Sequence, residues 1–157
     1  MDKSKTCCFT GHRKLLKEQI EQIMKRLNFE VDKLIAKGVT DFISGGAPGF
    51  DLLASSLIIA KKEMGKNIRL IFLLPCKNHE ELWQDQQRAF FQNLLAEADE
   101  VIYLKEAYYE GCAEERDCNM VNRSSYCICA LAHPFGSTKK TIRYAREKHL
   151  HIINVAE

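Results

Sequence analysis

Short apolar runs alternate along this chain with longer segments in which apolar residues recur at helical spacing. Residues 68–75 form a nearly continuous apolar run, which is typical of a strand buried on both faces of a parallel sheet. Residues 15–37 instead place their apolar side chains on one face of a helix. The predicted strands are residues 6–9, 41–44, 68–75, 99–104, 126–132 and 151–155, and the predicted helices are residues 15–37, 52–64, 79–96, 116–125 and 138–148.

The regular alternation of strands and helices predicts an α/β fold, with a doubly wound, mostly parallel sheet flanked by helices on both faces. The chain has 157 residues, of which 46% are hydrophobic, and this is enough for one substantial core but not for two. No segment has the composition of a linker or a repeat. We therefore expect a single domain that spans residues 1–157.

The charge and hydropathy of the chain exclude some classes of partner. Lys and Arg number 23 against 21 acidic residues, so the net charge of +2 gives no field strong enough for nonspecific nucleic-acid binding. No apolar stretch approaches the roughly 18 to 20 residues that span a bilayer, and residues 1–5 lack the hydrophobic region of a signal peptide. We expect a cytoplasmic protein with no membrane partner.

The seven cysteines do not have the spacing of a metal site. No Cys-x2-Cys pair occurs, so we expect no bound zinc or other metal. Cys76, next to Pro75 at a predicted strand end, and Cys112 are the two candidates for thiol reactivity. The other cysteines that lie in predicted strands are expected to pack as small hydrophobes, and they are Cys7, Cys8, Cys127 and Cys129.

A glycine-rich turn joins the second predicted strand to the second predicted helix. Such a turn aims backbone N–H groups and the positive end of a helix dipole at one point, where an anion such as a phosphate can bind. Alternatively, the glycines only supply the positive φ angles of a tight connection. The candidate ligand-binding residues here are Ser44, Gly45, Gly46, Ala47, Gly49 and Asp51.

Two further polar turns follow predicted strands, and the carboxyl ends of parallel strands share one edge of a sheet. The first contains Thr10, Gly11, His12 and Arg13. Arg13 suits a phosphate or carboxylate but also suits an exposed helix start, and a lone histidine is more often structural than catalytic. The second turn contains Gly136, Ser137 and Thr138, which are phosphate donors or ordinary helix-capping residues.

Five residues are considered for individual roles. Asp51 is suited equally to bind a ribose hydroxyl or to accept from backbone N–H groups at its helix start. Tyr108 follows a strand end, where it can stack on a base or ribose. Arg116 and Asn119 share one face of a polar helix, which either lines the binding crevice or is simply exposed. Trp83 is expected to be a packing residue.

Three motifs carry a family resemblance over nearly the whole chain: Thr10-Gly11-His12-Arg13, Gly45-Gly46-Ala47-Pro48-Gly49-Phe50-Asp51, and Gly136-Ser137-Thr138 followed by Thr141-Ile142-Arg143-Tyr144-Ala145. The chain resembles the SLOG superfamily of Rossmann-like domains, which includes the SMF/DprA DNA-processing proteins and the LOG nucleotide hydrolases. It is most similar to the small YpsA/YspA-like branch. The resemblance implies a pocket for a nucleotide or a nucleotide-derived ligand such as ADP-ribose or NAD.

The chain departs from the hydrolase branch at one position. LOG hydrolases carry a glutamate three residues after a glycine-threonine pair, and the corresponding residue here is Thr141. A hydroxyl does not supply the charge that stabilises a cationic ribosyl transition state, and Asp51 or Glu115 would have to replace the carboxylate. Asp51 is therefore the one weak catalytic candidate, and whether the chain is an enzyme stays open.

Three functions remain. The leading one is binding or sensing of a nucleotide-like small molecule, with no separate cofactor required. The second is an enzyme that cleaves or transfers at a nucleotide's ribose, as in the phosphoribohydrolases. The third is DprA-like handling of single-stranded DNA, against which the near-neutral charge argues. Homo-oligomers occur among related folds, but no surface of this sequence indicates one.

Overall fold

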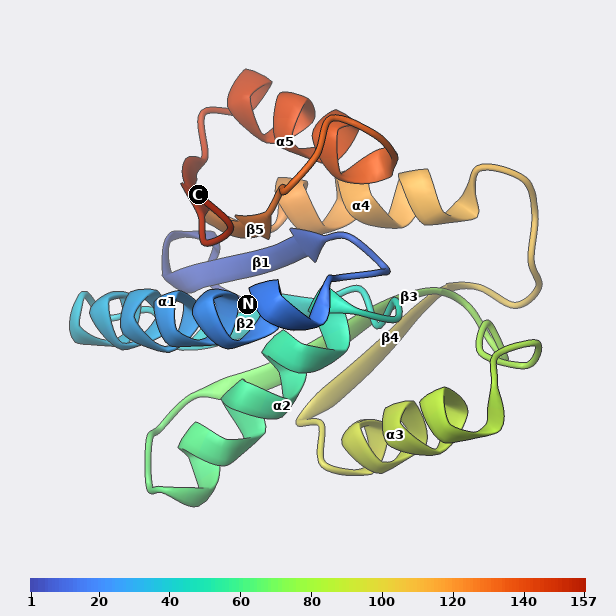
Figure 1. Ribbon diagram of the computed structural model, residues 1–157, viewed down its shortest axis with the longest axis horizontal. Helices are drawn as coiled ribbons and strands as arrows, with labels where there is room; N and C mark the ends of the chain where they lie inside the picture. Colours follow the sequence, from blue (N-terminus) through green and yellow to red (C-terminus); the bar gives the residue numbers. More distant parts are fainter.

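All six strands join one parallel sheet in the order β4-β3-β2-β1-β5-β6, in which β5 lies beside β1 (Figure 1). The computed structural model describes residues 1–157. The strands are β1 Thr6–Gly11, β2 Asp41–Ser44, β3 Arg69–Cys76, β4 Glu100–Lys105, β5 Tyr126–Ala130 and β6 His151–Asn154. The structure confirms the predicted α/β, Rossmann-like class, and the sheet is entirely parallel.

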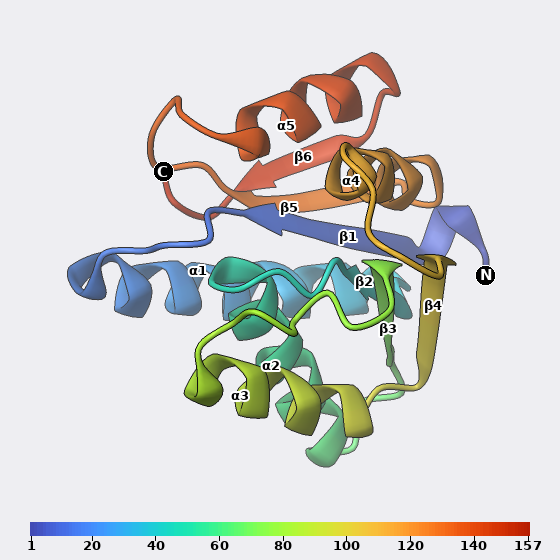
Figure 2. The ribbon, with the colours of Figure 1, turned by 90° about the vertical axis from the view of Figure 1, so that its right-hand side faces the viewer.

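The helices divide between the two faces of the sheet. Figure 2 shows α4 and α5 on one side, and α1, α2 and α3 on the other. Their bounds are α1 Lys17–Ala36, α2 Phe50–Glu63, α3 Asp85–Ala96, α4 Cys112–Asn122 and α5 Ser137–Glu147, preceded by the short 3-10 helix η1 Lys3–Lys5. No helix combines the length and the apolar character needed to cross a membrane.

The nearly continuous apolar run at residues 68–75 is explained by the position of β3 between two hydrophobic cores. Its alternate side chains point to opposite faces of the sheet. Leu70, Phe72 and Leu74 join the larger core cluster with α1, α2 and α3, whereas Ile71 and Leu73 join the smaller cluster with α4 and α5. Both faces of β3 are therefore covered, and neither permits polar residues. Cys7 packs in the larger core, and Cys8, Cys127 and Cys129 pack in the smaller one, all as free thiols.

Several predicted boundaries differ from the structure, and three of them have a clear structural cause. The helix predicted over residues 79–96 begins only at Asp85, because residues 77–82 form turns and the His79 ring packs 5.0 Å from the Phe91 ring. The helix predicted from residue 116 begins at Cys112, since Gly111 starts it in the left-handed region with φ 89°. Strand β1 continues through Gly11 because that residue pairs with Ala130 of β5.

The order of the strands creates a switch point between β1 and β5. The chain adds β2, β3 and β4 on one side of β1, then returns to add β5 and β6 on the other. In open α/β sheets, ligands bind outside the carboxyl ends of the strands at such a point. The loops after β1 and β5 are therefore the expected walls of a binding crevice.

Gly49 holds the β2–α2 turn against the loop after β1. Its φ is 87° and its ψ is −126°, and a Cβ on this residue would lie 2.4 Å from the Arg13 carbonyl oxygen and 2.5 Å from that of His12. The next residue, Phe50, donates its backbone N–H to the His12 carbonyl at 3.1 Å. Only glycine permits this approach, so two of the predicted binding loops form one unit.

We expect Gly49→Ala to destabilise the protein much more than Gly65→Ala. Gly65 has a similar φ of 96° but open space around its Cβ position. Its substitution should therefore cost only the left-handed backbone term of about 1–2 kcal/mol, whereas the Gly49 variant adds a clash with two carbonyl groups and should lose at least about 2 kcal/mol more. Urea denaturation of both variants measures the difference, and equal losses would contradict the close approach.

Candidate functional site

Two cavities open along the carboxyl edge of the sheet, and Arg13 lines both. The smaller has a volume of about 280 Å³, lies at the β1/β5 switch point, and is lined by Gly11, His12, Arg13, Lys14, His133, Phe135, Gly136, Ser137 and Thr138. The larger, of about 630 Å³, lies beyond the ends of β3 and β4. The structure thus brings two of the predicted turns, at residues 10–13 and at residues 136–138, together in one cavity.

The small cavity has the character of an anion site. Gly136 precedes α5 with φ 90° and has no side chain, and no protein group accepts from the first-turn N–H groups of α5. Arg13 and Lys14 are exposed beside this helix start and form no hydrogen bond or ion pair. No acidic residue lines the cavity. Free N–H groups, a helix dipole and two cations therefore converge where an anion would be stabilised.

His12 connects the two walls of the small cavity. Its Nε2 accepts from the backbone N–H groups of Ala132 at 3.0 Å and His133 at 3.3 Å, and its ring stacks on the His133 ring at 3.7 Å. Burial, followed by the charge of His133, lowers the pKa of His12. The ring is therefore a neutral acceptor that holds the β5–α5 loop against the end of β1.

The glycine-rich turn itself is closed in the structure. Its N–H groups bond within the protein: Gly46 donates to Ser44 Oγ at 3.2 Å and Ala47 to Asp51 Oδ2 at 3.3 Å. Gly45, Gly46 and Ala47 are all buried. This differs from the open anion-binding turn that the sequence predicts, because an oxygen of the Asp51 side chain occupies the position where an anion would accept from the turn. Of its two candidate roles, Asp51 here makes the backbone contact.

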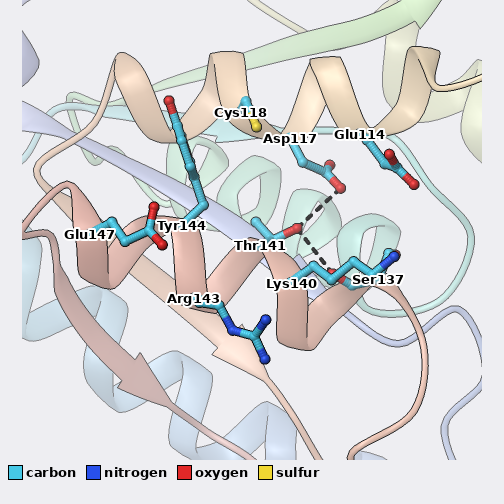
Figure 3. Close-up of a pocket in the computed structure, with 9 residues that line it drawn as sticks. All are labelled: Glu114, Asp117, Cys118, Ser137, Lys140, Thr141, Arg143, Tyr144 and Glu147. Carbon is cyan, nitrogen blue, oxygen red and sulfur yellow. Dashed lines mark hydrogen bonds between the residues drawn. The ribbon is translucent and has the colours of Figure 1, made fainter.

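A buried arginine covers this turn from the other face of the sheet. Arg116 on α4 is 4% exposed, donates from Nη1 to the Gly45 carbonyl, and pairs from Nε with Asp117 Oδ1 at 2.7 Å. Thr141 places its hydroxyl 3.2 Å from both Asp117 Oδ2 and the Ser137 carbonyl (Figure 3). The turn after β2, helix α4 and the start of α5 are thereby joined in one polar network.

Figure 3 also shows a third cavity, of about 280 Å³, between α4 and α5. It is lined by residues of both charges, among them Glu114, Glu147, Lys140 and Arg143. Of the predicted ligand-binding residues, it reaches only Ser137. Its contribution to the site is therefore limited to the Asp117–Thr141 contact, which fixes the start of α5.

The large cavity is half apolar and carries the aromatic groups. It is lined by Arg13, Pro75, Cys76, Lys77, Asn78, His79, Glu81, Leu82, Trp83, Glu106, Ala107, Tyr108, Cys112 and Ala113. Tyr108 is 75% exposed at its rim. Trp83 has both a packing contact, with its ring 5.3 Å from that of Phe91, and a surface in the cavity. Rings of this kind can stack on a nucleobase.

The structure separates the predicted site residues into three groups. Arg13, Ser137 and Tyr108 are exposed at the cavities, whereas Thr10, Thr138 and the glycine-turn residues are buried, except Gly49, which is half-buried. Asn119 lines none of the three cavities and accepts from Arg123 Nε at 3.2 Å. The sequence analysis missed Lys14, His79, Asp117 and His133. The rule that ligands sit beyond strand ends could have found His79 and His133, but nothing in the sequence marks Asp117 as buried.

Two titratable side chains, those of Asp51 and His79, each have one buried polar atom with no hydrogen-bond partner. Burial raises the pKa of Asp51 to about 7, although the nearby Arg116 acts in the opposite direction, and Asp51 Oδ1 has no hydrogen bond. Burial lowers the pKa of His79 to about 4, with Arg116 and Arg13 adding to the effect, and His79 Nε2 also has no partner. At pH 6 the folded protein therefore holds a proton on Asp51 and none on His79.

The stability of Asp51→Asn relative to the unchanged protein should rise with pH. Between about pH 4 and pH 7, folded Asp51 keeps a proton that the unfolded chain, with its ordinary pKa of 3.8, has released. This group alone makes the free energy of unfolding fall as pH rises. Removing it should therefore make the slope of that free energy against pH more positive, by up to about 1.4 kcal/mol per pH unit.

His79→Gln should have the opposite effect between about pH 4 and 6.5, because the unfolded histidine binds a proton that the folded one lacks. In the unchanged protein the two contributions nearly cancel in this window. Urea denaturation across pH 4 to 8 measures all three slopes, with the exposed Asp85→Asn as control. Parallel curves for Asp51→Asn and the unchanged protein would contradict a buried, protonated carboxyl group.

Several known proteins are similar to this chain. UPF0398 protein BH1768 of Halalkalibacterium halodurans is 32% identical over 97 residues, which cover 62% of this chain and 51% of the relative. The SPbeta prophage-derived protein YoqJ of Bacillus subtilis is 23% identical over 133 residues, 76% of this chain and 78% of that protein. The chain thus spans about half the length of the UPF0398 relative.

Among solved structures, DNA processing protein A shares this fold. The Helicobacter pylori protein, described for its single-stranded DNA binding, has a TM-score of 0.67 at 17% identity, over 96% of this chain and 65% of that one. The Streptococcus pneumoniae protein has a TM-score of 0.70 at 14% identity, over 96% and 50% of the two chains. The model of the YspA SLOG family matches residues 7–153, and the chain belongs to this family.

Proposed function

We propose that this protein binds a phosphate-bearing nucleotide across the carboxyl edge of its sheet. The observation that carries the proposal is the position of Arg13, which is exposed, forms no ion pair, and lines both the small cationic cavity and the large half-apolar one. A ligand that fills both cavities needs an anionic end and a flat, largely apolar end joined by a short polar link. A nucleoside phosphate has this construction.

The phosphate belongs in the small cavity. There the free N–H groups of Ser137, Thr138 and Lys139 at the start of α5 supply directional donors, while Arg13 and Lys14 supply charge. The α5 start is held by the Thr141 hydroxyl and its two acceptors. These donors are therefore pre-organised, which reduces the entropy lost on binding.

The base belongs in the large cavity, where Tyr108 and Trp83 offer aromatic surfaces. The volume of about 630 Å³ is within the range of small-molecule sites. His79 lines the same wall, and its buried Nε2 atom has no hydrogen-bond partner in the protein. Because burial keeps this imidazole neutral at pH 7, His79 adds no charge to the wall beside an uncharged base.

Cleavage at the ribose is the less supported alternative. Thr141 stands where the hydrolase family has its glutamate, and it is 5% exposed with its hydroxyl against Asp117. Asp51 is also buried, 5% exposed, beneath the closed glycine turn, and Glu115 pairs with the Tyr109 hydroxyl. None of these carboxylates lines the two edge cavities. Binding without turnover is therefore the expected activity.

Single-stranded DNA is a second candidate ligand. It is favoured by the likeness to DNA processing protein A and by three exposed apolar side chains along the same edge, Leu82, Tyr108 and Phe135, at 96%, 75% and 72% exposure. Sites for single strands combine stacking side chains with basic residues, and Arg13 and Lys14 lie beside these three. Such binding would fall steeply with added salt.

We expect nucleoside 5′-phosphates to raise the melting temperature, and Arg13→Ala to weaken their binding roughly tenfold or more, because a charge-assisted bond to phosphate is lost. Isothermal calorimetry on mono-, di- and triphosphates, NAD and ADP-ribose measures the affinity. Unphosphorylated nucleosides and the exposed Arg146→Ala variant are the matched controls, since Arg146 lines none of the three described cavities.

Three outcomes separate the candidate functions. A phosphate-dependent affinity that needs Arg13, without product formation, supports the binding role, whereas product in the same samples supports the ribosyl enzyme. Tighter, salt-sensitive binding of single-stranded oligonucleotides would replace both with DNA handling. Nucleosides binding as well as their phosphates would contradict the assignment of the small cavity.

A further inference from the structure

We propose that Cys76 and Cys112 form a redox-sensitive thiol pair in the wall of the large cavity, which a hydroperoxide converts to a disulfide. Both cysteines line this cavity and both are free thiols in the structure. They lie 36 residues apart along the chain, since Cys76 ends β3 and Cys112 begins α4. The fold alone brings them together.

The two thiols lie in one wall of the cavity. Helix α4 packs against β3, and Cys112 is near enough to Cys76 to contribute, after burial, to the raised pKa of the Cys76 thiol. Cys76 is 1% exposed and Cys112 is 3% exposed, so bulk solvent reaches them poorly except through the cavity that they line. A small oxidant that enters this cavity meets both thiols in the same wall.

No other cysteine has both a neighbouring thiol and a described cavity. Cys118 lines the cavity between α4 and α5 but has no second cysteine there. The remaining four lie within the sheet, at most 1% exposed, and line none of the three cavities, and they are Cys7, Cys8, Cys127 and Cys129. The structure therefore predicts selective oxidation of one pair among seven thiols.

The reaction balances with hydrogen peroxide as the two-electron oxidant. One thiol loses its proton, and the thiolate attacks a peroxide oxygen; the O–O bond breaks and a sulfenic acid and one water form. The second sulfur then attacks the sulfenic sulfur, the S–O bond breaks, and hydroxide leaves to take up the remaining thiol proton as a second water. Burial raises the pKa of Cys76, so the first step should be slow and should require sustained oxidant.

The backbone around Cys112 has room to move when the disulfide forms. A disulfide brings the sulfur atoms to about 2.05 Å, closer than two thiols in contact. Gly111, just before Cys112, has open space at its Cβ position, and residues 105–108 are exposed. The start of α4 can thus shift toward the end of β3, and Tyr108 and Ala113 move with it in the cavity wall. The effect on ligand affinity rests on the proposed function.

The disulfide is tested without any ligand. The reduced full-length protein is treated with hydrogen peroxide, remaining thiols are alkylated, and peptides are mapped by mass spectrometry. We expect a Cys76–Cys112 bridge as the main product, reversed by dithiothreitol. The bridge should persist in the control Cys118→Ser and disappear in Cys112→Ala and in Cys76→Ala. Oxidation of Cys118 while Cys76 and Cys112 remain thiols would overturn the proposal, as would any other dominant pairing.

The coupling to the cavity is tested by calorimetry with the tightest-binding nucleotide. Oxidised protein should bind it roughly tenfold more weakly than reduced protein, a typical coupling between two sites, and Cys112→Ala should show no change on oxidation. Equal affinities in a protein mapped as bridged would overturn the coupling. If the reduced protein binds no nucleotide, the proposed function fails, while the peptide map still decides the thiol pair.

Discussion

The buried guanidinium of Arg116 is the interaction on which the carboxyl edge of the sheet depends. An arginine does not lose its charge in proteins, so its neutralisation has to come from neighbouring groups. Its Nε pairs with Asp117, and its Nη1 donates to the Gly45 carbonyl. A Cβ on Gly45 would lie 2.9 Å from Nε, so only glycine admits the cation there. Because Asp117 already balances this charge and adds its own, burial prevails at Asp51 and raises its pKa to about 7.

This network separates three turns that look alike in the sequence. In the glycine turn, backbone N–H groups donate to the side chains of Ser44 and Asp51. In the loop after β1, the His12 carbonyl accepts from the Phe50 N–H. Only the third turn keeps its N–H groups free, because the residue before α5 is a glycine and no side chain accepts there. The turns at residues 10–13 and 44–51 therefore build the edge, and the turn at residues 136–138 is the one that binds the anion in the proposed function.

The sequence predicts the layers of this fold well because each strand and helix shows its burial in its own hydrophobic period, as β3 does. It predicts the site less well, because burial of a polar residue is a tertiary property. Arg116 has the spacing of an exposed helix face, and only the approach of Gly45 reveals that it is buried. Residues 79–84 have a helical pattern, but the aromatic packing of His79 and Trp83 on Phe91 overrides it.

Within the proposed function, the distribution of charge along the edge favours a single nucleotide over single-stranded DNA. Although the net charge is only +2, positive and negative side chains are unevenly distributed between the two cavities. The small cavity is lined by Arg13 and Lys14 and by no acidic residue, while Glu81 and Glu106 are among the residues that line the large one. Lys77 neutralises Glu106 at 3.2 Å, but Glu81 has no ion pair. A polynucleotide carries phosphates along its whole length and would pass this acid, whereas a mononucleotide presents its charge only to the cationic end. The two cavities are therefore matched to a ligand that is itself charged at one end.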